Sequence, residues 1–156
     1  MLSIENNQIH FHYDAEDLYI QAWGQNGLRV QATKNCKFTG NNWALVEENK
    51  AVGKTSISDA KASIANGKIK LVITNGGKIT IFNGDQKILE EYWRNRRDVT
   101  DSKCSAIEVE AREFRPNIGG DYHLTFRLES LCKDEKLYGM GQYQQPYLNL
   151  KGMDLE

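Results

Sequence analysis

Cysteine is scarce in this sequence and follows no recognisable spacing. The chain has 156 residues and three cysteines, Cys36, Cys104 and Cys132. An odd number of widely spaced cysteines without a CxxC pair argues against a disulfide framework and against a zinc site. Free thiols are typical of a reducing compartment, and the first residues lack the basic segment and apolar run of a secretion signal. We therefore expect a cytoplasmic protein.

The sequence also lacks an excess of charge of either sign and any long apolar run. It has 20 Lys and Arg against 21 Asp and Glu, for a net charge of −1. This balance argues against general binding to nucleic acid or to an anionic membrane surface. No stretch approaches the roughly 18 apolar residues of a transmembrane helix. With 40% hydrophobic and 26% charged residues, the chain is predicted to be globular and to have its own core.

What the sequence does have is a period-two alternation of apolar and polar residues. Two prolines and 13 glycines are typical of strands joined by tight turns. The alternation covers residues 9–13, 18–22, 28–32, 69–73, 79–82, 107–111 and 122–128. A period of two indicates strands that bury one face. About eight or nine such strands predict an all-β fold, an antiparallel β-sandwich.

The clearest local signal is a hairpin over residues 68–82. Asn75, Gly76 and Gly77 supply residues that tolerate positive φ between two alternating stretches, as a tight reversal requires. Residues 43–46 are predicted to form a further short strand. Residues 56–65 and 87–98 fit a short amphipathic helix about as well as a strand, so both assignments stay open.

His10 and His12 form an H-x-H pair on one face of a predicted strand, a spacing that can hold a metal ion. A third ligand would have to come from elsewhere, for example His123 or Asp14. The alternation with apolar neighbours favours the other interpretation, in which all three histidines lie on polar, solvated strand faces. We expect no metal and no cofactor.

Carboxylates are frequent, but their spacing does not predict a catalytic pair. They occur as neighbours at 14–17, 47–48, 90–91 and 134–135. Neighbours on a strand point to opposite faces, whereas a glycosidase needs two carboxylates facing each other across the sugar. We expect these groups on solvated turns and strand edges, and no catalytic residue. The sequence also has no G-x-S-x-G, phosphate-loop or H-E-x-x-H motif.

Two further segments have compositions that favour binding. Arginines at 94, 96 and 97 adjoin Tyr92 and Trp93. They could clamp an anion, but this composition favours a protein interface. Residues 138–152, YGMGQYQQPYLNLKG, combine flexible glycines with tyrosine rings and glutamine amides, which suit a polar, ring-shaped ligand. The alternative, tyrosines that pack on the sandwich, fits the composition equally well.

The motifs GGDYHLTFRLES from residue 119 and DEKLYGMGQYQQPYLNLKG from residue 134 resemble glycoside hydrolase family 31. The resemblance is strongest to bacterial α-xylosidase and α-glucosidase members. It extends to EEYWRNRRD, AREFRP and the hairpin from Asn66, and is weaker before that residue. The core Tyr-Gly-x-Gly-Gln at 138–142, followed by Leu-x-Leu-Lys-Gly at 148–152, is the specific part.

The resemblance implies an N-terminal, galactose-mutarotase-like β-sandwich at 1–137, followed by a segment at 138–156 that leads toward a (β/α)₈ barrel. Family members hydrolyse α-glycosides with retention through two aspartates of that barrel, neither of which maps onto this chain. By analogy, Trp93 and Arg94 would contact the barrel. Tyr143, Gln144 and Tyr147 would lie near the substrate entrance.

The sequence therefore favours a non-catalytic domain of a cytoplasmic, bacterial α-glycosidase. Its partners would be its own barrel and an α-glycoside, not nucleic acid or membrane, and the isolated domain could self-associate. Glucose and xylose remain equal candidates for the sugar. The alternative is a free-standing carbohydrate-binding module in which Tyr143 and Tyr147 stack on the sugar.

Overall fold

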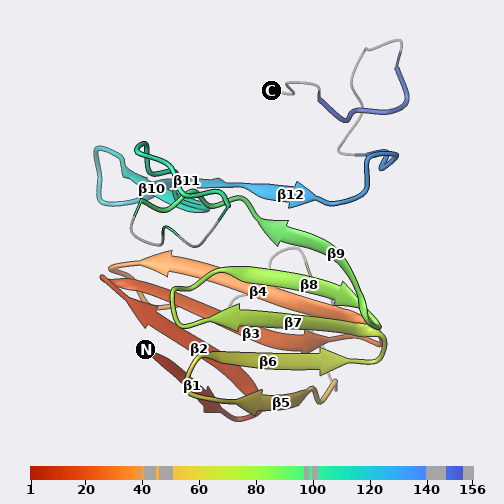
Figure 1. Ribbon diagram of the computed structural model, residues 1–156. Coiled ribbons are helices and arrows are strands. Elements are labelled where there is room, and N and C mark those ends of the chain that lie inside the picture. The colour runs from red at the N-terminus through yellow and green to blue at the C-terminus, as the bar shows by residue number, and fades with distance from the viewer. Residues whose placement is uncertain are drawn as a thin grey trace.

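The computed structural model describes residues 1–38, 40, 45, 51–96, 99, 102–139 and 147–152, and every regular element among them is a β-strand (Figure 1). These described residues contain no helix long and apolar enough to cross a membrane. The strands pair antiparallel throughout. The predicted all-β sandwich is confirmed.

The first sheet is built from the N-terminal part of the chain in simple sequence order. Among the described residues it has four strands, β1 (Leu2–Glu5), β2 (Gln8–Tyr13), β3 (Glu16–Trp23) and β4 (Gly27–Lys34). The turns between β1 and β2 and between β2 and β3 use positive φ at Asn-Asn and Asp-Ala pairs, the conformation that two-residue hairpin turns need.

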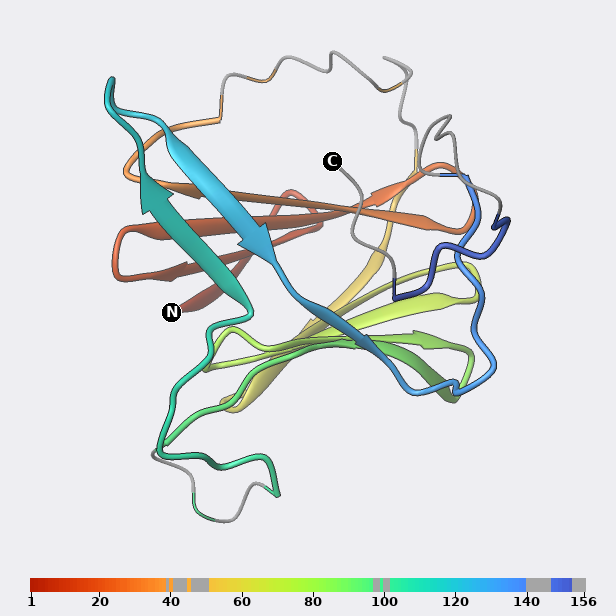
Figure 2. The ribbon, with the colours of Figure 1, turned by 90° about the horizontal axis from the view of Figure 1, so that it is seen from above.

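The second sheet contains the predicted hairpin. Its order within the described residues is β12-β9-β8-β7-β6-β5. The strands are β5 (Lys54–Ile57), β6 (Lys61–Asn66), β7 (Ile69–Thr74), β8 (Ile79–Asn83), β9 (Gln86–Glu91) and β12 (Leu128–Ser130). The two sheets stack as layers (Figure 2), and β3 lies against β6 while β4 lies against β7.

A separate hairpin, β10 (Arg112–Pro116) and β11 (Tyr122–Phe126), spans the two layers. Figure 2 shows it crossing from the second sheet toward the first. Asn35, just after β4, donates a hydrogen bond to the Tyr122 hydroxyl at 2.7 Å. Arg112 at the start of β10 contacts both sheets, as described below.

The core lies between the two sheets and follows the alternation in the sequence. Its fully buried side chains come from alternate positions of neighbouring strands: Ile9 and Phe11, Leu18, Ile20 and Ala22, Ala62 and Ile64, Leu71 and Ile73, and Ile79. Burying alternate residues on both layers is what defines the inner faces of a sandwich. The predicted inward faces at 9–11, 18–22 and 71–79 are thus confirmed, whereas Tyr13, which continues the first alternation, is exposed.

The two ambiguous segments are not helices. Residues 56–65 span β5 and β6, which form a hairpin. Residues 87–91 belong to β9, and the chain beyond runs on to a single antiparallel bridge between Arg94 and Val109. Residues 97 and 98 lie outside the described part, as do three of the four residues in the strand predicted at 43–46.

Two predictions from alternation are wrong. Residues 107–111 form no strand: Val109 makes a single bridge with Arg94, and Ile107 is exposed. Residues 122–128 do form strands, but β11 and β12 are separated at Arg127. Leu124, Phe126 and Leu128 are also exposed instead of belonging to the core. Alternation reports which residues share a face, not whether another layer covers that face.

Candidate functional site

The most completely built polar site is a buried charge cluster formed by Glu16, Glu91 and Arg112. The Arg112 guanidinium donates through Nε to Glu16, through Nη1 to Glu91, and through Nη2 to the carbonyl of Gly77 at 3.0 Å. The second oxygen of Glu91 accepts the backbone N–H of Ile79 at 2.7 Å. Arg112 thereby joins β10 to β3, to β9 and to the turn before β8.

Burial sets the protonation behaviour of this cluster. Glu91 is fully buried, and this burial raises the pKa of its carboxyl above the ordinary value although Arg112 opposes the shift. Burial alone would lower the pKa of Arg112, but the Glu91 and Glu16 carboxylates outweigh it and raise that pKa. The guanidinium therefore stays charged between the two carboxylates.

The cluster is not a glycosidase pair. Both carboxylates are hydrogen-bonded to one guanidinium, which occupies the space that a sugar would need between them. No nucleophile or free acid is left at this position. The arrangement can hold the β10–β11 hairpin against the two sheets, which is a structural role.

Replacing Glu91 by glutamine is expected to change how stability depends on pH. A carboxyl whose folded-state pKa is raised contributes its stability below the unfolded pKa and loses it as pH rises through the folded value. The stability advantage of the wild type over Glu91→Gln should therefore be largest below about pH 4.5 and shrink toward neutrality. Urea unfolding of both proteins at several pH values measures this difference. A difference that grows from acid to neutral pH would contradict the raised pKa.

The neighbouring carboxylate, Glu90, belongs to a second network with different partners. It accepts hydrogen bonds from Lys87 at 3.1 Å and Lys103 at 3.2 Å, and Lys78 lies 3.5 Å away. Burial would raise the pKa of Glu90, but the bonds from Lys87 and Lys103 outweigh it and hold that pKa below its ordinary value. The prediction of solvated carboxylates is wrong at 90 and 91. Both are buried, and most of the cations that pair with them come from other segments of the chain.

His10 and His12 share one acceptor on the next strand. His10 Nε2 lies 2.7 Å and His12 Nδ1 lies 2.9 Å from the same oxygen of Asp17. Burial would raise the pKa of Asp17, but these hydrogen bonds lower it below the ordinary value. The His10 ring also stacks on Tyr19 at 4.4 Å. In the described part of the chain, no group of three His, Cys, Asp or Glu side chains is arranged to hold a metal ion.

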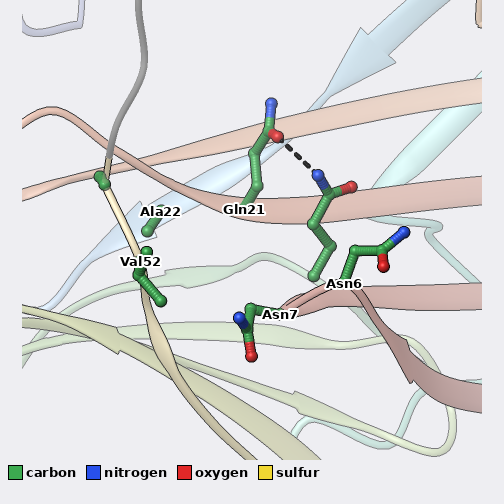
Figure 3. A pocket seen from close by; sticks show the side chains of 7 residues that line it. Asn6, Asn7, Gln21, Ala22 and Val52 are labelled. Atoms are coloured by element: carbon green, nitrogen blue, oxygen red, sulfur yellow. Dashed lines mark hydrogen bonds between the residues drawn. The ribbon is translucent and has the colours of Figure 1, made fainter.

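A shallow hollow lies beside the β1–β2 turn (Figure 3). Its volume is about 160 Å³, and its lining consists of Asn6, Asn7, Gln8, Gln21, Ala22, Ala51 and Val52. Gln8 donates to Gln21 across it at 3.0 Å. Amides can bind sugar hydroxyls, but none of these lining residues is aromatic or charged. Sequence reasoning missed this hollow, because its amides come from a turn and two strands that only pairing brings together.

The predicted interface residues lie after β9. Trp93 is half-buried against the turn between β7 and β8, where a side chain at Gly76 would come within 3.0 Å of the indole. Arg94 is exposed, with its guanidinium 5.3 Å from the centre of the Tyr92 ring. Trp93 thus already has a packing partner inside the sandwich, whereas Arg94 is accessible.

The predicted entrance residues are only partly described. Tyr143 and Gln144 lie outside the described residues. Tyr147 is described and well exposed. The segment near it is anchored to the rest of the chain, because Leu150 donates its N–H to Leu137 at 2.8 Å and the Leu150 side chain is buried.

Known proteins share the sequence and the fold of this chain over nearly its whole length. No family model matches the chain. It is 38% identical, over 159 aligned residues and 96% of its length, to an uncharacterized family 31 glucosidase, ORF2, of Pseudescherichia vulneris. The crystal structure of a GH31 α-xylosidase from a soil metagenome, complexed with xylose, covers 98% of the chain with a TM-score of 0.90 and 38% identity.

The chain spans 30% of the length of that glucosidase and 24% of that xylosidase. It is an antiparallel, all-β sandwich with a hairpin that spans the two sheets. In the described buried clusters, the Glu16 and Glu91 carboxylates are both bound to Arg112 and are not a free, opposed pair. The chain is related to glycoside hydrolase family 31, as its motifs predict.

Proposed function

We propose that this chain is the N-terminal, non-catalytic β-sandwich of a retaining α-glycosidase that acts on terminal α-linked glucose or xylose in the bacterial cytoplasm. Its role is to support the catalytic barrel of the same polypeptide. Tyr143, Gln144 and Tyr147 would shape the substrate entrance, and Trp93 and Arg94 would contact the barrel. The two relatives are a glucosidase and an α-xylosidase, so the sugar stays open between these two.

The observation that carries this proposal is the combination of similarity and length. Identity of 38% extends over nearly the whole chain, yet the chain accounts for less than a third of either relative. The charged clusters support the same view, since Glu16, Glu90 and Glu91 are each held by cations. Hydrolysis requires carboxylates that are free to donate a proton and to attack the anomeric carbon.

The direct test is an activity assay of the purified chain on aryl α-glucoside and aryl α-xyloside. We expect release of the aryl alcohol no faster than in an enzyme-free blank. The product of any longer reading frame that contains these 156 codons serves as the matched positive control and should hydrolyse at least one substrate. Turnover by the chain alone, or an inactive longer product, would contradict the proposal.

A second candidate is a free-standing carbohydrate-binding module, which the exposed ring of Tyr147 and the amide-lined hollow favour. Such a module would bind a mono- or oligosaccharide in isothermal titration with the chain alone. It would also have a reading frame that stops after Glu156. Absence of heat exchange with glucose, xylose and their α-linked disaccharides would remove this candidate.

A further inference from the structure

The exposed apolar side chains are concentrated in the C-terminal part of the sequence. Of the sixteen large hydrophobic residues that are exposed among those described, nine lie at positions 118–148. The ten residues of the buried core cluster, in contrast, all lie at or before Ile79. The C-terminal third of the chain thus exposes apolar surface and adds almost nothing to the core. A concentration of this kind marks an interaction site.

Three of these residues form one continuous face, which we call the opening surface: Leu124 and Phe126 on β11 and Leu128 on β12. Their relative exposures are 41%, 45% and 44%. Phe126 is the cross-strand partner of Arg112, and Leu128 is the partner of Glu91. Directly paired residues of an antiparallel ladder share a face, so Phe126 and Leu128 lie on the side from which Arg112 and Glu91 reach each other. Leu124 follows at a spacing of two.

The opening surface is incompletely covered because the two sheets differ in width. Among the described residues the first sheet ends at β4 after four strands, whereas the second continues past β7 through β8 and β9 to β12. The β10–β11 hairpin crosses from the second sheet toward the first (Figure 2). Leu124 and Phe126 on its apolar side are more than 40% exposed, so no full layer of side chains covers them.

The opposite side of the hairpin has a different character. Glu113 accepts hydrogen bonds from Arg115 at 2.8 Å and from Arg127 at 2.7 Å. These charges satisfy one another and are suited to solvent. One face of the hairpin is therefore polar, while the other face exposes leucine and phenylalanine side chains.

We infer that the opening surface docks an apolar segment of the additional polypeptide by which the family 31 relatives exceed this chain. This inference rests on the proposed function and adds the contact surface to it. About 70% of the glucosidase and 76% of the xylosidase lie outside the matched length, so a covalently linked partner is available in such proteins. Contact within one polypeptide suits an apolar surface of this kind, because a linked partner is always present to cover it.

The test introduces the photo-crosslinking residue p-benzoylphenylalanine in place of Phe126, or in place of the fully exposed Ile118 as the matched control. The protein used is the product of the complete reading frame that contains these codons. After irradiation, the crosslinked peptides are identified by mass spectrometry. We expect position 126 to crosslink to a peptide outside residues 1–156 of the same polypeptide, with at least fivefold lower yield from position 118.

A second measurement avoids dependence on one probe. In the complete protein, Phe126→Asp should lower the melting temperature by several degrees more than Ile118→Asp does. In the 156-residue chain alone, the melting temperatures of the two variants should differ much less. Three results would each overturn the inference: equal effects of Phe126→Asp on the melting temperatures of both proteins, crosslinks from position 126 to a second copy, or a reading frame that ends at Glu156.

Aryl glycosidase activity of the same preparation separates the two proposals. An active protein without the crosslink refutes only the docking surface, and an inactive one with the crosslink refutes only the proposed function.

Discussion

Replacing Arg112 by alanine is expected to lower the free energy of unfolding by about 3–5 kcal/mol, because it leaves the buried Glu91 carboxylate, and the partly buried Glu16, without their cation. Glu91 is fully buried, and both it and Glu16 depend on this one guanidinium. The same substitution removes the contact of β10 with the carbonyl of Gly77. Urea unfolding followed by tryptophan fluorescence measures the loss.

Arg115→Ala is the matched control on the same strand. Arg115 is largely exposed and, within the described part of the chain, forms an ion pair with Glu113, so its removal should change the free energy of unfolding very little. If Arg112→Ala does not fold, the double substitution Arg112→Met with Glu91→Leu should recover folded protein, since apolar replacement of a buried pair is often neutral. An Arg112→Ala protein within 1 kcal/mol of wild type would show that the cluster is dispensable.

Gly77→Ala is expected to destabilise the sandwich by about 2–4 kcal/mol, through positive φ and overpacking together. Gly77 has φ of +87°, and an added Cβ would lie 2.7 Å from Phe11 Cζ and 3.2 Å from Arg112 Nη2. Phe11 is part of the buried core and Arg112 is part of the buried charge cluster. Neither side chain can move without disturbing a site that the fold depends on.

Gly84→Ala separates the two causes. Gly84 also has positive φ, +59°, but no atom lies within 4 Å of its hypothetical Cβ. Its replacement should cost only the backbone strain of about 1–2 kcal/mol. Thermal or urea unfolding of the two variants gives the packing contribution as their difference. Equal losses would mean that Phe11 and Arg112 adjust freely at Gly77.

Much of the fold was predictable because it depends on short-range geometry. The alternation over residues 9–22 and 69–79 specified which side chains face inward, since a strand turns successive residues to opposite faces. Asn75, Gly76 and Gly77 indicated the reversal between β7 and β8 for the same local reason. The motifs at 119–130 and 134–152 likewise indicated the resemblance to family 31 from the sequence alone.

The candidate site was less predictable, because burial depends on partners far away in the chain. Glu90 and Glu91 read as solvated carboxylates, yet Lys103 and Arg112 bury them from segments that follow much later. Segment 87–91 could have been helix or strand, and it is a strand because β8 and β12 supply hydrogen bonds on both sides. The entrance residues Tyr143 and Gln144 stay predictions, as does the interface at Trp93 and Arg94.

The amino-acid sequence alone thus determined that the fold is all-β, which faces of the central strands point inward, where the tight turns lie, and which family the chain resembles. All of these follow from backbone geometry and from interactions between near neighbours. Only the tertiary structure decided that Arg112 joins two sheets and that Leu124, Phe126 and Leu128 are exposed. These outcomes depend on which distant segments meet, and the stability of such contacts is set by desolvation and packing at the point where they meet.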